Sequence, residues 1–170
     1  MSKAFTRESD DQPERPMLNR PSSSLPPGAK NYLTPAGAQR LREELDRLTQ
    51  MERPRLAASP DEGEARRELQ ILDQRIHLLQ HSLHSAEVVP PPVGLPDRVR
   101  FGATVLVRSS SGEESRYRVV GVDETDIDRG WVSWVSPIAR ALVNAQVGQR
   151  VRFKFPSGEE ELEIVEIAFE

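Results

Sequence analysis

The sequence predicts an α+β protein in which an antiparallel coiled-coil hairpin of two helices precedes an antiparallel β-sheet domain with one short helix. Apolar residues recur at alternating spacings of three and four over residues 38–48 and again over residues 69–83, which is the pattern of a coiled-coil seam. From Arg98 onward the apolar period becomes two, which is typical of strands. Residues 88–97 are rich in proline and predict a linker between the two parts.

Length and charge exclude several classes of protein. The chain has 170 residues, of which 36% are apolar and 29% charged, so it has room for one ordinary domain plus a smaller element. No apolar run approaches the ~20 residues that cross a bilayer, and residues 1–20 mix both charge signs, so neither a membrane span nor a secretory signal is predicted. The net charge of −4 argues against general nucleic-acid binding through a basic surface. We therefore expect a cytoplasmic monomer.

Metal ligation has little support in the sequence. The absence of cysteine excludes disulfides and thiolate metal sites. The three histidines, His77, His81 and His84, all lie on the second helical arm. The first two stand four residues apart, a spacing that can bind zinc, but no third ligand is near them in sequence, and a solvated helix face is the alternative that we favour. We expect no metal bound stably to the free protein and no cofactor of its own.

The coiled-coil hairpin is expected over residues 31–87, after a disordered tail over residues 1–30 that is rich in proline, serine and charge. Thr34 is a good N-cap, and Pro35 occupies the first helical position, where its missing N–H does no harm. Pro54 should interrupt the hydrogen-bond ladder of the first arm and cause a kink or a restart, because a proline inside a helix removes one hydrogen bond and clashes with the preceding turn.

The predicted tip of the hairpin, residues 57–64, is acidic and has two interpretations. Residues 59–62 form a capping box that would start the second helix, where carboxylates favour the helix dipole. Alternatively, Asp61 and Glu64 present two carboxylates side by side on one exposed helix turn, which suits the sharing of a Mg²⁺ ion. Two carboxylates are too few to hold Mg²⁺ alone, so a partner would have to supply the other ligands.

The sheet domain is expected over residues 98–170. Residues 109–112 and 156–158 have the composition of hairpin turns between strands. Ser136 would cap the short helix and Pro137 would open it. Together these signals predict a small antiparallel sheet that is covered by one helix.

Several segments resemble one known family. These are Phe101-Gly102-Ala103-Thr104-Val105, Val119-Val120-Gly121-Val122-Asp123-Glu124, Ser136-Pro137-Ile138-Ala139-Arg140-Ala141-Leu142 and Val147-Gly148. In order and spacing they closely resemble the C-terminal domain of the bacterial Gre transcript-cleavage factors, of the GreA and GreB type. Leu33-Thr34-Pro35-Ala36-Gly37 and Glu52-Arg53-Pro54 are similar to the start of that family's coiled-coil domain. The resemblance covers about residues 31–170 and implies an FKBP-like fold for the C-terminal domain.

The resemblance also implies that the chain works through RNA polymerase. In the family, the C-terminal domain binds near the rim of the secondary channel and the coiled coil enters it. An Asp-x-x-Glu pair at the tip helps the polymerase active site hold a second Mg²⁺ for cutting backtracked RNA. Asp61 and Glu64 match that pair, so the chain would be a cofactor of the polymerase active site and no enzyme itself. The Mg²⁺ would be shared with the polymerase, and the nascent RNA 3′ end would be met only indirectly.

The surface that contacts the polymerase is also implied by the resemblance. It would lie around the acidic segment after Val122 and the short helix of the sheet domain. The residues that we expect to make the contact are Asp123, Glu124, Asp126, Ser136, Pro137 and Arg140.

Two departures from the family pattern leave the outcome of binding open. Gly63-Glu64-Ala65 stands where the family has Ser-Glu-Asn-Ala, and both arms are shorter by roughly one heptad. At ~1.5 Å per residue, a missing heptad pulls the carboxylates back by ~10 Å. The chain would therefore either stimulate cleavage, which we favour because the carboxylate pair is retained, or occupy the secondary channel without cleavage. Prolyl isomerase activity is a third hypothesis, but it needs an aromatic-lined pocket, and only 5% of the residues are aromatic.

Overall fold

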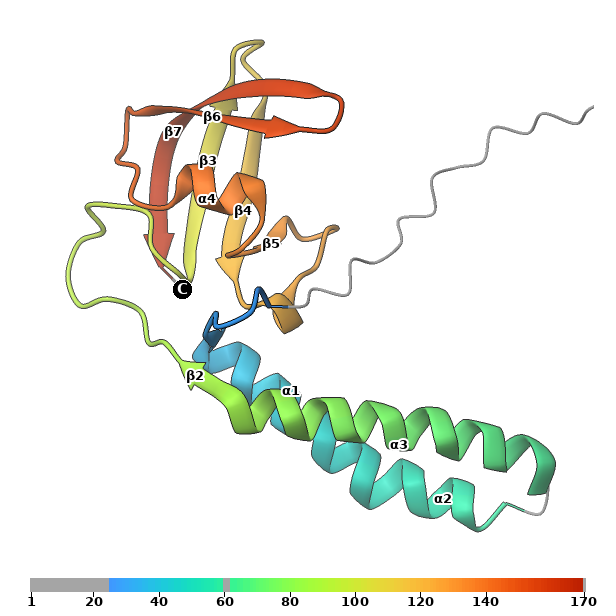
Figure 1. Cartoon of the computed structure of the whole chain (residues 1–170). Coiled ribbons are helices and arrows are strands. Elements are labelled where there is room, and N and C mark those ends of the chain that lie inside the picture. Colours follow the sequence, from blue (N-terminus) through green and yellow to red (C-terminus); the bar gives the residue numbers. More distant parts are fainter. Residues whose placement is uncertain (1–24, 60–61, 170) are drawn as a thin grey trace, which may run out of the picture.

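The computed structural model describes residues 25–59 and 62–169. It is an α+β structure in which a helical hairpin extends from a curled β-sheet (Figure 1). Most of the predicted tail, residues 1–24, lies outside the described residues, and so does Asp61 of the predicted tip. In the described parts of the chain, no helix is both long enough and apolar enough to span a membrane.

The helical hairpin has a composite first arm and a continuous second arm. A short strand, β1 (Asn31–Leu33), leads into helix α1 (Pro35–Arg47). A π-helical turn (Leu48–Glu52) and helix α2 (Arg53–Ala57) complete the first arm. The second arm is one helix, α3 (Glu62–Ser85), which runs back along the first (Figure 1).

The helical hydrogen-bond pattern of the first arm changes where the sequence predicts a kink or a restart. Pro54 stands in the first turn of α2, directly after the π-helical turn. A proline in a continuing helix would leave one carbonyl without its donor, and a wider turn accommodates that loss. Helix α1 begins as expected, because the Thr34 hydroxyl accepts a hydrogen bond from the Gly37 N–H at 2.9 Å and Pro35 holds the first position.

The two arms bury one stripe of apolar side chains against each other. The buried members are Leu33, Ala38, Leu41, Leu48, Leu72, Ile76 and Leu79, with Leu45, Leu56 and Leu83 partly buried beside them. This stripe contains the periodic residues of both predicted arms except Leu69, which is only partly buried and lies outside it. Supercoiling of the arms stays a prediction.

A second, two-stranded sheet closes the base of the hairpin, and the sequence analysis missed it. Strand β2 (Ala86–Val88) pairs in parallel with β1, with Asn31 opposite Ala86 and Leu33 opposite Val88. The Val89 N–H then donates to the Leu33 carbonyl at 2.9 Å. The chain therefore enters and leaves the hairpin at the same place.

The sheet domain contains five strands in the order β5-β4-β3-β7-β6. Their bounds are β3 (Ala103–Ser109), β4 (Glu114–Val120), β5 (Trp131–Ser133), β6 (Arg150–Phe155) and β7 (Gly158–Phe169). All neighbours are antiparallel except β4 and β5, which pair in parallel. The expectation of a wholly antiparallel sheet is therefore wrong, and the sheet is mixed.

The parallel pair has a simple geometric cause. Arg118 lies opposite Trp131 and Val120 lies opposite Ser133, so the pairing covers only the end of β4. For β5 to run in the same direction as β4, the connection between them has to return the chain only as far as Arg118. A 3₁₀ turn (Val122–Glu124) begins this connection. Apolar alternation along a strand carries no information on its direction, which is why the sequence could not reveal the parallel pair.

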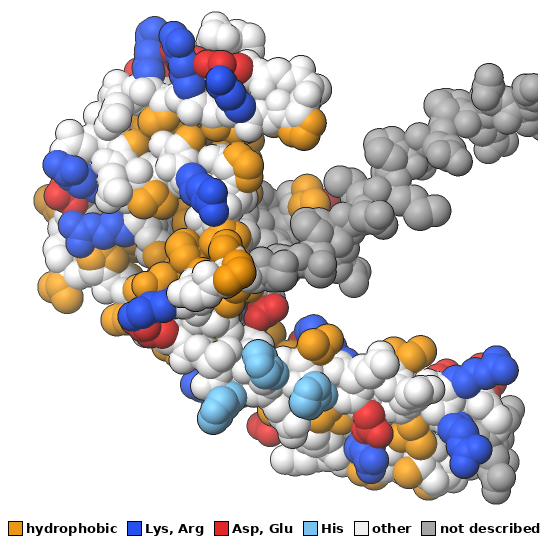
Figure 2. Space-filling model, in the orientation of Figure 1, with side chains coloured by type: hydrophobic (Ala, Val, Ile, Leu, Met, Phe, Trp, Pro, Cys, Tyr) orange, Lys and Arg blue, Asp and Glu red, His pale blue; other side chains and the backbone are white. Residues whose placement is uncertain are grey.

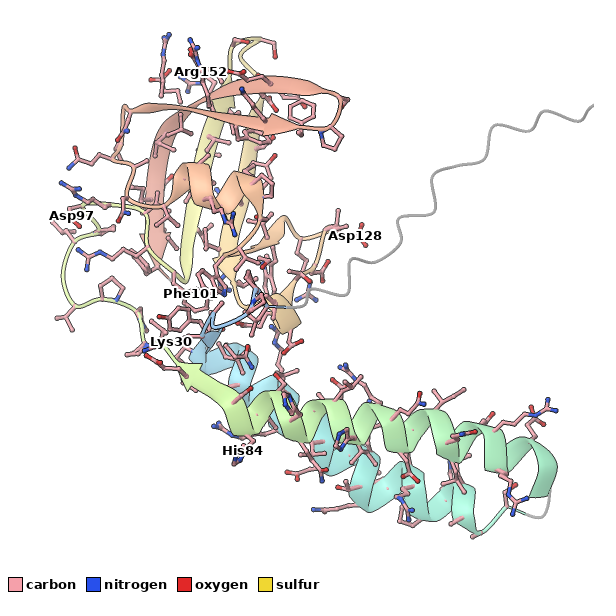
Figure 3. All side chains as sticks on the ribbon, in the orientation of Figure 1. Lys30, His84, Asp97, Phe101, Asp128 and Arg152 are labelled. Carbon is pink, nitrogen blue, oxygen red and sulfur yellow. The ribbon has the colours of Figure 1, made fainter. Side chains whose placement is uncertain are left out.

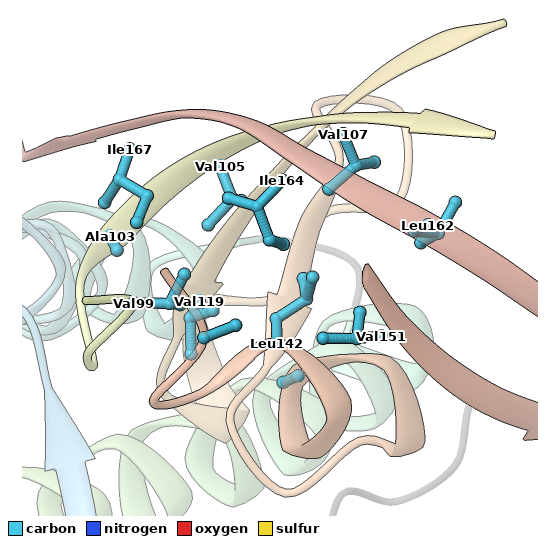
Figure 4. Close-up of a cluster of buried hydrophobic side chains, with 12 residues drawn as sticks. Val99, Ala103, Val105, Val107, Val119, Leu142, Val151, Leu162, Ile164 and Ile167 are labelled. Atoms are coloured by element: carbon cyan, nitrogen blue, oxygen red, sulfur yellow. The ribbon is translucent and has the colours of Figure 1, made fainter. Parts of the chain in front are cut away.

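The core of the sheet domain lies between the sheet and helix α4 (Pro137–Leu142), which covers one face (Figure 1). Its side chains come from four strands, from α4 and from the connecting segments at Val99 and Ala145 (Figure 4). The fully buried members are Val99, Ala103, Val105, Val107, Val119, Ala139, Leu142 and Ile164. The finer expectation of an FKBP-like fold stays a prediction.

Candidate functional site

The far end of the helical hairpin is the first candidate site. Helix α2 ends at Ala57, whose side chain is exposed, and α3 begins at the same far end (Figure 1). Glu64 lies in the first turn of α3 and is exposed to solvent. Its predicted partner Asp61 lies outside the described residues, so the carboxylate pair stays a prediction.

Residues 25–59 and 62–169 contain no group of three or more histidine, aspartate or glutamate side chains that could hold a metal ion. The three histidines are exposed and lie together on the surface of α3 (Figure 2). A metal ion bound to these histidines would therefore need further ligands from another molecule.

Two ion pairs connect the arms of the hairpin. The Arg75 guanidinium donates to both carboxylate oxygens of Glu44, at 2.8 and 2.9 Å, and this hydrogen bonding raises the pKa of Arg75. Nearer the far end, Arg53 makes a similar two-pronged contact with Asp73, at 2.8 and 3.3 Å. Both pairs are partly open to water, so each adds little to stability while favouring this pairing of α3 with the first arm.

The second candidate site is the junction between the hairpin and the sheet domain, and Glu124 lies at its centre. This side chain is 1% exposed. One of its carboxylate oxygens accepts hydrogen bonds from the N–H groups of Thr34 and Gly121, each at 2.9 Å. The other accepts the hydroxyl hydrogen of Thr34, the residue that caps α1. The structure therefore turns the charge of Glu124 inward, whereas the sequence analysis placed this residue on a polymerase-contacting surface; contact with the polymerase stays a prediction.

Two glycines make the close approach at Glu124 possible. A Cβ atom on Gly37 would lie 1.8 Å from a carboxylate oxygen of Glu124. A Cβ atom on Gly121 would lie 2.2 Å from the carbonyl oxygen of Tyr32. Real atoms do not approach this closely, so any larger residue at either position would push the two parts of the protein apart.

Aromatic and cationic contacts surround the junction. The Tyr32 ring of β1 lies 5.7 Å from the ring of Phe101 and 5.1 Å from that of Trp134, measured between ring centres. Phe101 stands between the sheet domain and the start of the hairpin (Figure 3). On another side, the Arg40 guanidinium lies 4.7 Å from the centre of the Trp131 ring, a distance that allows a cation–π interaction.

The remaining predicted contact residues lie on accessible positions. Asp123 is exposed and accepts a hydrogen bond from the Ser82 hydroxyl of α3, and Asp126 pairs with Arg129 at 3.3 Å. On α4, Pro137 and Arg140 are exposed, whereas Ser136 uses its hydroxyl to cap the Ala139 N–H at 3.3 Å. These positions are open to a partner, and the contact itself stays a prediction.

Comparison with known proteins identifies the family. Residues 94–169 match the family model described as the C-terminal domain of the transcription elongation factors GreA and GreB. A transcription elongation factor GreA from Alkalilimnicola ehrlichii is 42% identical over 156 residues, which cover 83% of this chain and 99% of the relative. A transcription elongation factor GreB from Neisseria meningitidis is 38% identical over 154 residues, covering 82% of this chain and 94% of the relative.

This chain belongs to the GreA/GreB family. The resemblance seen in the sequence is thereby confirmed. A solved GreA/GreB structure from Nitrosomonas europaea is 25% identical and covers 82% of this chain and 100% of that one, with a TM-score of 0.41.

In this GreA/GreB chain, the junction is what sequence reasoning missed. Thr34, Gly37 and Glu124 meet although the last is far from the others in sequence. One signal was present. A glycine in the first turns of an amphipathic helix costs roughly 0.5–1 kcal/mol relative to alanine, so Gly37 indicates a close approach. Nothing local in the sequence says that its neighbour is Glu124.

Proposed function

We propose that this GreA/GreB family member binds RNA polymerase at the secondary channel and stimulates cleavage of backtracked transcripts. The helical hairpin would enter the channel, and Asp61 and Glu64 at its far end would help the polymerase active site hold a second Mg²⁺. The sheet domain would dock at the rim of the channel through Asp123, Asp126, Pro137 and Arg140. Family membership supports the polymerase as partner.

One observation carries the proposal. The hairpin stands clear of the sheet domain along most of its length, and its far end is the part of the described structure most distant from the sheet (Figure 1). At ~1.5 Å per residue, the 24 residues of α3 span about 36 Å. A narrow two-helix probe of this length, with Glu64 exposed near its end, suits delivery of a carboxylate into a channel.

The chemical role of such a carboxylate follows from Mg²⁺ coordination. Mg²⁺ takes oxygen ligands in octahedral geometry at 2.0–2.1 Å and keeps several waters. Two extra carboxylate oxygens would raise the occupancy of a second ion and orient one of its waters for attack on the phosphodiester. The polymerase would supply the permanent ligands, so the free protein needs no metal site.

A cleavage assay on a stalled, backtracked elongation complex tests the proposal, with polymerase binding measured in the same sample. We expect shortened RNA with the wild-type chain. Asp61→Asn combined with Glu64→Gln should bind equally well and lose about 10²-fold or more in cleavage rate. Glu68→Gln removes an exposed carboxylate one turn further along α3 and should change little. Wild-type binding without any cleavage would contradict the proposal and indicate a protein that occupies the channel only.

A further inference from the structure

The junction at Glu124 determines where the far end of the hairpin points, and this has a consequence for the proposed function. We infer that Glu124 is a positioning residue: through Thr34 and the Gly37 contact it sets the direction of the helical hairpin relative to the sheet domain. It would thereby determine where the tip carboxylates reach once the sheet domain is docked. This inference deepens the proposed function and relies on it for the cleavage readout alone.

The covalent connection between the two parts does not fix their relative direction. Residues 90–98 form no backbone hydrogen bond with the described remainder of the chain. Two of their apolar side chains are fully exposed, Val93 at 105% and Leu95 at 96%. A segment without such bonds follows the elements that it joins. The direction of the hairpin must therefore come from non-covalent contacts at the junction.

Packing leaves one side of the junction open. A cleft of about 250 Å³ lies beside Glu124, between α1, α3 and the segment around Asp123. Most of the residues that line this cleft are polar or charged, and Leu41 is an apolar one among them. The directional contacts there are polar, because the three hydrogen bonds to Glu124 join its carboxylate to the cap of α1 and to Gly121. Hydrogen bonds constrain angles as well as distances, which apolar contacts do less strictly.

The hydrogen bonds run in a chain from the sheet domain into the first turn of α1. Gly121 donates to Glu124, Thr34 donates to Glu124 through its N–H and its hydroxyl, and the Thr34 oxygen accepts the Gly37 N–H. Arg40 lies one helical turn beyond Gly37, with its guanidinium 3.8 Å from the same carboxylate. Glu124 thus fixes both the position and the axis of the helix start.

The length of the hairpin amplifies any change at this point. A rotation of about 15° at the base of a hairpin about 36 Å long moves its far end by about 9 Å. Metal coordination tolerates errors of only tenths of an ångström. A variant with a loosened junction should therefore still dock through its sheet domain while its tip carboxylates miss the ion. This separates a positioning role from a docking role.

Two variants disrupt the junction from opposite sides. Glu124→Ala removes the acceptor on the sheet domain. Gly37→Ala keeps Glu124 but places a methyl group where the carboxylate lies, and alanine favours the helix in which it would stand. Glu124→Gln retains an acceptor for the two N–H groups and serves as the conservative variant. Val107→Ala, in the core of the sheet domain and away from the junction, controls for a general loss of stability.

The first measurement is the distance between two spin labels, which does not depend on polymerase. The chain has no cysteine, so Ala57→Cys on the hairpin and Ser110→Cys on the β3–β4 turn give two unique exposed sites. We expect a narrow distance distribution for the wild type, Glu124→Gln and Val107→Ala, and a broadened or shifted one for Glu124→Ala and Gly37→Ala. Wild-type distributions in both of the last two variants would overturn the inference, as would a Gln variant as broad as the Ala variant.

The second measurement is cleavage as a function of factor concentration. Glu124→Ala and Gly37→Ala should lower the maximal cleavage rate by about tenfold or more, and the half-saturating concentration should change by less than about twofold. A raised half-saturating concentration with an unchanged maximal rate would overturn the inference and restore Glu124 as a docking residue. If the wild type does not cleave at all, the proposed function fails, while the spin-label distances still decide the inference.

Discussion

The two parts of the molecule bury their apolar side chains to different depths. In the sheet domain, Val105, Leu142 and Ile164 are completely buried. In the described part of the helical hairpin, the apolar side chains that are at most 2% exposed are Leu33, Ala38 and Leu79, which lie near the base. Further along the arms, Leu48 retains 6% exposure and Leu72 retains 8%. The comparison teaches that the deepest burial in the hairpin lies at its base, next to the sheet domain.

The largest effect should come from the sheet core. Leu142→Ala removes a completely buried side chain between α4 and the sheet, and we expect the free energy of unfolding to fall by about 3–4 kcal/mol, from lost transfer energy plus a cavity. Urea denaturation followed by the fluorescence of Trp131 and Trp134 measures it. A loss below about 1 kcal/mol would mean that α4 collapses into the space and that this core is looser than its burial indicates.

The same type of substitution in the hairpin should cost less and act locally. We expect Leu72→Ala to lower the stability of the hairpin by about 2 kcal/mol. The cost is smaller than in the sheet core because the seam is narrow and water can enter much of the space that the leucine leaves. Hydrogen exchange should accelerate in α1 and α3 and stay unchanged in β3 and β7. Leu78→Ala is the matched control on the same helix, since Leu78 is 61% exposed. Equal acceleration in both parts would show that they unfold as one unit.

The smallest effect should come from the ion pairs across the hairpin. Glu44→Gln removes the acceptor of Arg75, and both side chains are partly open to water, so we expect a loss of about 0.5 kcal/mol that disappears in concentrated salt. Thermal unfolding at low and high ionic strength measures this loss. Asp46→Asn, an exposed acid on the same helix, is the control. A loss of more than about 2 kcal/mol would show that this pair, more than the apolar seam, holds the arms together.

What could be predicted from the sequence depends on whether the cause is local. The caps at Thr34 and Ser136 were predicted because a cap involves residues that are three apart in sequence, and both hydrogen bonds are present. The turn at Gly112 was predicted for the same reason, and this glycine has a φ of +86°. In contrast, the pairing of Asn31–Leu33 with Ala86–Val88 joins short segments at opposite ends of the hairpin, and no local pattern records it.

The candidate site shows the same division. The acidic segment after Val122 was expected to be exposed, and Asp123 is. Its neighbour Glu124 has the same charge but is buried. There its carboxylate accepts hydrogen bonds from the N–H groups of Thr34 and Gly121. Composition cannot separate two adjacent acids that face opposite ways. The pairing of Asp61 with Glu64 was inferred from spacing alone and stays a prediction.

The parallel pair of β1 and β2 gives the hairpin a modular character. Because the chain enters and leaves through adjacent strands, the hairpin is topologically an insertion with both ends on one base. Matched segments could be removed from or added to its arms without displacing the strands at that base or the sheet domain beyond them. The length of the hairpin and the docking surface of the sheet domain could then change independently in evolution. Paired deletions in the two arms would shorten the hairpin and leave that docking surface intact.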